Sequence, residues 1–74
     1  MEYPIGTKFI SIGKYPKECT VIDVLKTYNS KNELVEVNYS AVHNFLGQEI
    51  IQKYLPEASI ARGVFELERK LKKV

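Results

Sequence analysis

The sequence predicts one small domain that is mostly β, with four or five short strands followed by a C-terminal amphipathic helix. The chain has 74 residues, 45% of them hydrophobic, which is enough for one thin core. Short runs rich in Val, Ile, Thr and Tyr alternate with turns that carry Gly, Pro or Asn, a pattern typical of antiparallel strands. The last eleven residues are instead rich in Glu, Leu, Lys and Arg, which favour helix.

The first strand is predicted over residues 7–12, after an irregular lead-in. A loop follows over residues 13–18, because Gly13 allows unusual backbone angles and Pro16 has no amide donor. The strongest strand signal in the chain comes next, over residues 19–28, where β-branched and aromatic residues dominate.

The central feature of the predicted sheet is a hairpin of two long strands. The first is residues 19–28, and a polar turn at residues 29–33 contains two Asn, which tolerate left-handed backbone angles. Residues 34–42 then alternate with a period of two. The residues expected on one face of this strand are Val35, Val37, Tyr39 and Ala41.

The segment after the hairpin is less regular. Residues 42–47 lose the alternation and end at a Gly, which indicates a second turn or a bulged strand end. Residues 48–54 contain the apolar pair Ile-Ile and favour another strand, with a short helix as the alternative. Residues 57–62 fit either a last strand or the start of a helix, and Gly63 separates them from the last eleven residues.

A helix is predicted over residues 64–74, with its acids early and its bases late, as the helix dipole prefers. Its apolar residues form a narrow seam, which we call the docking seam: Val64, Leu67, Leu71 and Val74. Eleven residues are too few for a stable isolated helix. The helix should therefore dock on a β domain of residues 1–63 or on a partner chain.

Two architectures fit these elements. One is a small SH3-like or otherwise partly open antiparallel β-barrel with the helix at its end. The other is a curved antiparallel sheet with the helix packed across it.

The residue types needed for catalysis or metal binding are scarce. One Cys and one His exclude an internal disulfide and a Cys-cluster zinc site. The only set with a thiol and an imidazole is Cys19, His43 and Asp23, and the spacing of four places Cys19 and Asp23 on one face of one strand. Nothing in this set resembles an activated nucleophile. We therefore expect no catalytic residue, metal or cofactor, and expect His43 to be a half-buried or surface imidazole bonded to backbone.

The sequence does suggest a binding surface. Tyrosine offers rigid contact area with a polar tip, although tyrosines in small β domains also serve as core residues. Lysines next to tyrosines in predicted loops and near the hairpin turn favour a protein partner. The residues expected to bind it are Lys14, Tyr15, Lys17 and Tyr28.

The positive charge of the chain is concentrated at its end. Residues 1–61 hold six lysines and seven acids, a net charge of −1, whereas residues 62–74 hold five bases and two acids, a net charge of +3. The alternative function is therefore nucleic-acid binding, with tyrosines stacking on bases and a basic helix contacting phosphates. The residues expected to do so are Arg62, Arg69, Lys70, Lys72 and Lys73. The same run also fits a solvated helix face or a homodimer through the C-terminal helix.

Four stretches carry a resemblance that covers most of residues 5–63. They are Ile5-Gly-Thr-Lys-Phe9, the run from Cys19 to Asn29, Ala41-Val-His-Asn-Phe-Leu-Gly-Gln48 and Pro56-Glu-Ala-Ser-Ile-Ala-Arg-Gly63. Together these resemble short proteins encoded by bacteriophages and prophages. The resemblance implies a compact β fold, the cytoplasm of a bacterial host cell and a host protein as partner. It implies no activity, and no functional residue is carried over from it.

The sequence shows no membrane segment. The start Met-Glu-Tyr-Pro-Ile-Gly lacks the cationic and apolar regions of a signal peptide. No apolar run approaches the roughly 20 residues that span a bilayer.

Overall fold

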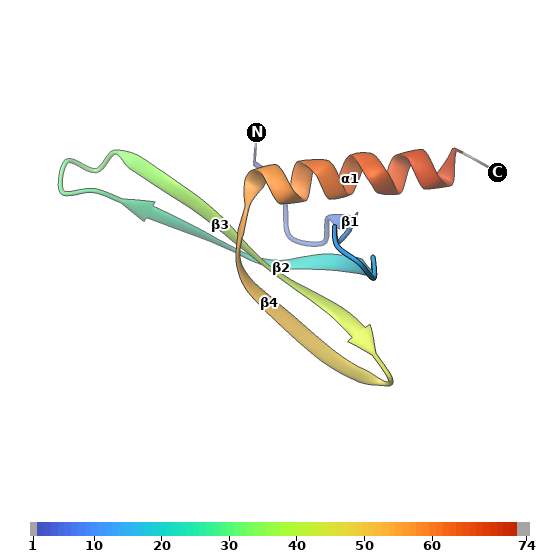
Figure 1. Cartoon of the computed structure of the whole chain (residues 1–74). Coiled ribbons are helices and arrows are strands. Elements are labelled where there is room, and N and C mark those ends of the chain that lie inside the picture. The colour runs from blue at the N-terminus through green and yellow to red at the C-terminus, as the bar shows by residue number, and fades with distance from the viewer. Residues whose placement is uncertain (1, 73–74) are drawn as a thin grey trace.

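The computed structural model describes residues 2–72 and contains four strands and one helix (Figure 1). The strands form one antiparallel sheet in the order β1-β2-β3-β4. The elements are β1 (Lys8–Ile10), β2 (Glu18–Tyr28), β3 (Leu34–Phe45), β4 (Gln48–Pro56) and α1 (Glu57–Leu71). The expectation of a mostly β fold with a C-terminal helix is confirmed. The sheet is open, with β1 and β4 at its edges, and the helix packs against it.

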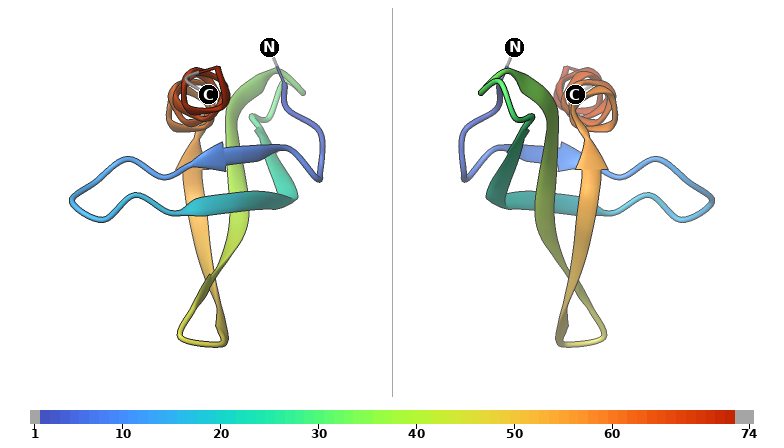
Figure 2. Two further views of the ribbon diagram at one scale, coloured as in Figure 1. Left: turned by 90° about the vertical axis from the view of Figure 1, so that its right-hand side faces the viewer. Right: turned by 90° about the vertical axis from the view of Figure 1, so that its left-hand side faces the viewer.

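The sheet bends sharply at an irregularity in β2. The pairing register shifts between Val21 and Asp23, which leaves Ile22 as a bulge. As a result β1 and the first part of β2 cross over β3 and β4, as Figure 2 shows. The bulge also reverses the face on which the next residues of β2 lie. The expectation that Cys19 and Asp23 share a face is therefore wrong: Cys19 is buried and Asp23 is exposed.

The two turns of the sheet use left-handed residues. The polar turn of residues 29–33 forms as predicted, and the side-chain oxygen of Asn29 accepts the backbone N–H groups of Lys31 and Glu33 at 2.8 and 3.0 Å. The second turn is the pair Leu46 and Gly47, with φ of 51° and 81°. Two consecutive positive φ values characterise the tight turn of a two-residue hairpin.

The core is small and lies where β1, the start of β2, the middle of β3 and the helix meet. Its fully buried members are Phe9, Cys19, Val21, Tyr39, Ala41 and Ile60. The hydroxyl of Tyr39 accepts the Tyr3 backbone N–H at 3.0 Å and donates to the Glu57 carboxylate at 3.3 Å. Burial raises the pKa of this phenol. The N-terminal segment and the first turn of the helix are thus tied to the centre of β3.

The helix begins at Glu57, earlier than the residue 64 predicted, so residues 57–62 are helical and Gly63 lies inside the helix. A side chain at Gly63 has no room: its Cβ would lie 2.6 Å from the Ile10 carbonyl oxygen and 2.7 Å from Cδ2 of Phe9. The glycine that looked like a separator is the point where the helix backbone touches β1.

Candidate binding site

The loop between β1 and β2, residues 11–17, is a compact ridge closed at its base. The Ser11 backbone N–H donates to the Lys17 carbonyl at 2.8 Å, and the Lys17 N–H donates to the Ser11 hydroxyl oxygen at 3.0 Å. The tip stays exposed, and Tyr15 is 73% exposed. One groove lies on each side of this loop. We call them the sheet-side groove and the helix-side groove.

The sheet-side groove has a volume of about 430 Å³ and lies between the loop, β3, β4 and the first turn of α1. Phe9 and Leu55 give it apolar walls, while Lys14, Tyr15 and Lys17 line it from the loop. An apolar hollow flanked by a few polar groups is the usual form of a ligand-binding site.

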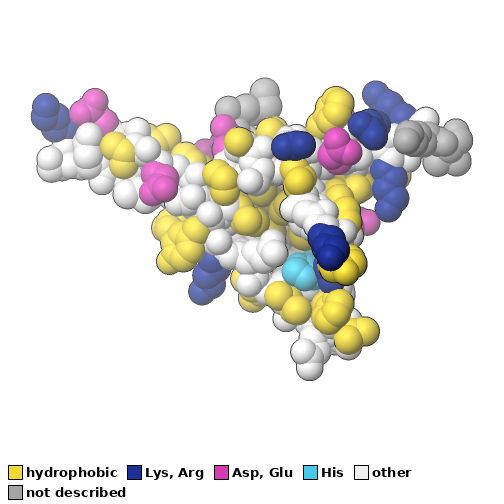
Figure 3. All heavy atoms as spheres, viewed as in Figure 1, with side chains coloured by type: hydrophobic (Ala, Val, Ile, Leu, Met, Phe, Trp, Pro, Cys, Tyr) yellow, Lys and Arg dark blue, Asp and Glu magenta, His cyan; other side chains and the backbone are white. Residues whose placement is uncertain are grey.

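One side chain that lines the sheet-side groove has a ring nitrogen without a hydrogen-bond partner in the described part of the chain. His43 lines the groove, and its Nδ1 atom is buried without a hydrogen-bond partner among the described residues. The hydrogen bond to backbone expected of this imidazole is therefore not made through Nδ1. The histidine side chain is visible beside lysine or arginine and hydrophobic side chains in Figure 3. A buried polar atom without a partner costs about 1–3 kcal/mol, so His43 is an unfavourable residue for the stability of the free protein.

A lysine–aromatic contact ties the loop to β3, and a second one lies within the loop. The Lys17 ammonium lies 3.7 Å from the centroid of the Phe45 ring, near the end of β3. The Lys14 ammonium lies 5.8 Å from the ring of Tyr15. Such contacts contribute about 0.5–1 kcal/mol at exposed sites. The loop is therefore anchored at its base and at one flank, which positions Tyr15 beside the groove.

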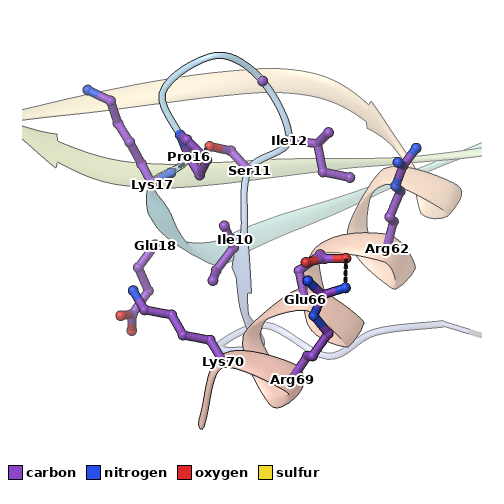
Figure 4. Close-up of a pocket in the computed structure, with 11 residues that line it drawn as sticks. Ile10, Ser11, Ile12, Pro16, Lys17, Glu18, Arg62, Glu66, Arg69 and Lys70 are labelled. Carbon is purple, nitrogen blue, oxygen red and sulfur yellow. Dashed lines mark hydrogen bonds and ion pairs between the residues drawn. The ribbon is translucent and has the colours of Figure 1, made fainter. Parts of the chain in front are cut away.

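The helix-side groove has a volume of about 490 Å³ and is bounded by the loop and one side of α1 (Figure 4). Its charged lining residues are Lys17, Glu18, Arg62, Glu66, Arg69 and Lys70. The Arg69 guanidinium lies 3.9 Å from the Glu66 carboxylate. Because two carboxylates accompany four bases, the groove is only moderately positive.

The structure brings together three of the four residues predicted to bind a protein. Lys14, Tyr15 and Lys17 all line the sheet-side groove. Tyr28 lies at the far end of the β2–β3 hairpin, which projects away from the loop in Figure 1. It lines a different depression, beside Glu2 and Lys26.

The residues predicted to bind nucleic acid are likewise only partly brought together. Arg62, Arg69 and Lys70 line the helix-side groove, whereas Lys72 is exposed at the end of the helix and does not. Lys73 lies outside the described residues.

Only part of the docking seam packs against the rest of the chain. Val64 packs against the core and Leu67 is half-buried, but Leu71 is 66% exposed. Val74 lies outside the described residues. The first half of α1 therefore covers the sheet, and its last turns extend past it.

Sequence reasoning missed His43, Phe9 and Leu55 as groove residues. A signal for His43 was present, because the alternation through Tyr39 and Ala41 continues to it on the same face of β3. No comparable signal existed for Leu55, whose position beside the loop depends on the bend of the sheet.

The lone thiol is not part of either groove. Cys19 is 1% exposed, and burial raises its pKa above the ordinary value of 9.0. Its Sγ lies 3.5 Å from the Lys17 carbonyl, to which it donates. A thiol held protonated in this way is a core residue rather than a nucleophile.

Comparisons with known proteins add no family or function. No protein-family model, curated protein or solved structure matches the chain. Within residues 2–72, no helix has the length and apolar character needed to span a membrane, and no group of His, Cys, Asp and Glu side chains is arranged to hold a metal ion.

Proposed function

We propose that this protein is a non-enzymatic interaction module that binds a protein partner in the sheet-side groove. The observation that carries the proposal is the convergence of Tyr15 and two lysines on an apolar hollow that His43 also lines. An extended peptide segment suits such a groove. An apolar side chain would contact Leu55, and an acidic group would lie near the lysines.

Tyr15 provides the first test, because Tyr28 is a matched control. Both rings are largely exposed, 73% and 54%, but only Tyr15 lines the groove. The full chain is immobilised, and proteins retained from a bacterial extract are identified, purified and titrated against each variant. We expect Tyr15→Ala to weaken binding at least about tenfold, as for an aromatic anchor, and Tyr28→Ala to have little effect. Retained proteins that bind both variants equally well would contradict the proposal.

His43 provides a second test. Replacing a buried polar group that lacks a partner by an apolar side chain of similar size removes a desolvation cost. We expect His43→Leu to stabilise the free protein by about 1 kcal/mol and to weaken partner binding. Urea unfolding and titration with the purified partner measure the two effects. Destabilisation together with unchanged binding would show that the imidazole has a structural role instead.

Nucleic-acid binding is the second candidate function, and the helix-side groove favours it. Arg62, Arg69 and Lys70 line this groove, whereas the Lys17 ammonium lies over the Phe45 ring. Titration of a short single-stranded oligonucleotide at several salt concentrations tests it. If these residues contact phosphates, Arg69→Ala should lower the slope of log affinity against log salt by about 0.7. A control is Lys31→Ala in the distant β2–β3 turn, and affinity no better than millimolar at low salt would reject this candidate.

The remaining expectations concern source and ancestry. The resemblance to phage and prophage proteins supports an accessory factor that acts on a host protein in the bacterial cytoplasm.

The strongly bent antiparallel meander supports kinship with SH3-like domains, although the sheet is open at β1 and β4. The exposed Leu71 supports self-association through the C-terminal helix, which Leu71→Glu would disrupt.

A further inference from the structure

The chain exposes more surface than a compact monomer of its size. Its accessible surface is 5760 Å² for a mass of 8.5 kDa, whereas a compact monomer of that mass exposes about 4650 Å². Its radius of gyration is 13.6 Å, against about 11.3 Å for a compact domain of this length. The difference in surface, about 1100 Å², exceeds the roughly 800 Å² that each partner contributes to a stable interface.

Strand β4 forms one unpaired edge of the sheet. It pairs with β3 on one side only, and every residue of the strand except Leu55 is exposed. Within the described residues, no backbone hydrogen bond outside the sheet ladder involves residues 48–53. An exposed edge of this kind is a template for another strand.

The backbone groups available along this edge are set by the hairpin turn. Phe45 and Gln48 flank the two-residue turn and pair with each other, so they exchange backbone hydrogen bonds. Because hydrogen-bonded positions alternate in antiparallel pairs, the backbone groups of Glu49 and Ile51 point toward the free edge, and Lys53 follows where the bulge begins.

The edge is protected only at one end. Tyr54 has a φ of 61°, and the register shifts between Tyr39 and Ala41, so β4 bulges opposite Ser40. Pro56 comes soon after, and it has no N–H to donate. A bulge and a proline discourage pairing, which leaves residues 48–53 as the open stretch.

We propose that two copies of this chain form a symmetric dimer by antiparallel pairing of their β4 strands, centred on Ile51. In this register Ile51 faces Ile51 of the second copy. Glu49 faces Lys53 of the second copy, and the symmetry makes this charge pair twice. The three residues share one face of the strand because they are spaced by two.

The charges single out a second copy as the occupant of this edge. A two-fold interface requires a surface that complements itself, and the strand from Gln48 to Lys53 carries opposite charges at equal distances from Ile51. Registers centred elsewhere do not place Glu49 opposite Lys53. The β1–β2 loop projects past β4 near the start of α1, whereas the β3–β4 hairpin end lies clear of the loop, which leaves that end of the edge accessible (Figure 2).

Light scattering during size-exclusion chromatography of the full chain tests the dimer. At chain concentrations of about 100 µM, far above a micromolar dissociation constant, we expect twice the mass of 8.5 kDa. Glu49→Lys and Lys53→Glu each place like charges opposite one another twice, and each should raise the dissociation constant about tenfold or more. Glu36→Lys, an exposed charge reversal on β3, should leave the mass unchanged.

Mixing the two variants gives the decisive result. Chains with Glu49→Lys and chains with Lys53→Glu have complementary edges, so the mixture should form a heterodimer although each alone is a monomer. The double variant E49K/K53E should dimerise by itself. Circular dichroism of each variant confirms that the sheet is formed.

Three outcomes would overturn the proposal. They are a wild-type monomer, a dimer that survives both charge reversals, and single variants that fail to associate on mixing. A dimer lost with Leu71→Glu but kept with Glu49→Lys would place the interface on the C-terminal helix instead.

Discussion

The centre of the molecule and the end of its β2–β3 hairpin have the same alternating β pattern and very different burial. At the centre, Val21 and Tyr39 are 0% exposed, whereas Leu25 and Leu34 near the β2–β3 turn are 50% and 52% exposed. Hydrophobic side chains are visible on both projecting hairpin ends in Figure 3. The burial differs because a second layer, formed by α1 and β1, covers the centre of the sheet but reaches neither hairpin end. A strand pattern specifies which face is apolar, but burial of that face depends on another element to cover it.

The largest expected effect is the loss of the helix side chain that seals the centre. Ile60 is 0% exposed and belongs to the core. Ile60→Ala should lower the free energy of unfolding by about 2–5 kcal/mol. A domain of this size has a total stability of roughly 4–11 kcal/mol, so the variant should unfold at a much lower urea concentration than the wild type. Urea unfolding followed by circular dichroism measures the loss.

The contrasting substitution lies at a hairpin end. Leu46 is 88% exposed in the β3–β4 turn, and Leu46→Ala should change the free energy of unfolding by less than about 0.5 kcal/mol. Equal losses for the two variants would show that the hairpin ends contribute to the fold as much as the centre does.

The next effect concerns the contact between the helix backbone and β1. Gly63→Ala gains about 1 kcal/mol of helix propensity, but its Cβ would meet the Ile10 carbonyl oxygen, which belongs to the backbone and cannot move aside freely. We expect a net loss of about 1–3 kcal/mol, typical of overpacking. Urea unfolding measures it, with Gly13→Ala as the control, because no atom lies within 4 Å of a Cβ at that position. A stabilised Gly63→Ala variant would mean that the helix is not pressed against β1.

The sequence predicted the sheet better than the helix. The central hairpin and its turn at residues 29–33 were predicted correctly, because alternation and turn residues are local signals. The start of α1 was wrong because Gly63 was interpreted as a break, although it is the close contact that lets the helix pack. The side of the strand on which Asp23 lies was wrong because a bulge at Ile22 leaves no sign in the pattern.

The candidate site was predicted only where one loop holds its residues. Lys14, Tyr15 and Lys17 are close in sequence, so grouping them needed no knowledge of the fold. His43 and Leu55 reach the same groove only because the sheet bends across itself. Tyr28 was grouped with the loop by residue type alone, and the direction of the β2–β3 hairpin separates them.

The smallest expected effect is the contribution of the buried Cys19 thiol to the pH dependence of the free energy of unfolding. Burial raises the pKa of Cys19 above 9.0, so above that pH the unfolded thiol loses its proton before the folded one does. The folded state then binds more protons, and the free energy of unfolding falls as pH rises. Cys19→Ala has no such proton, so the stability difference between wild type and this variant should narrow between about pH 8 and pH 10. Tyr39, whose pKa burial also raises, is present in both proteins and cancels in the comparison. A stability difference that stays constant over this range would mean that the thiol ionises as easily in the folded chain as in the unfolded one, and that the centre is more open to water than its burial indicates.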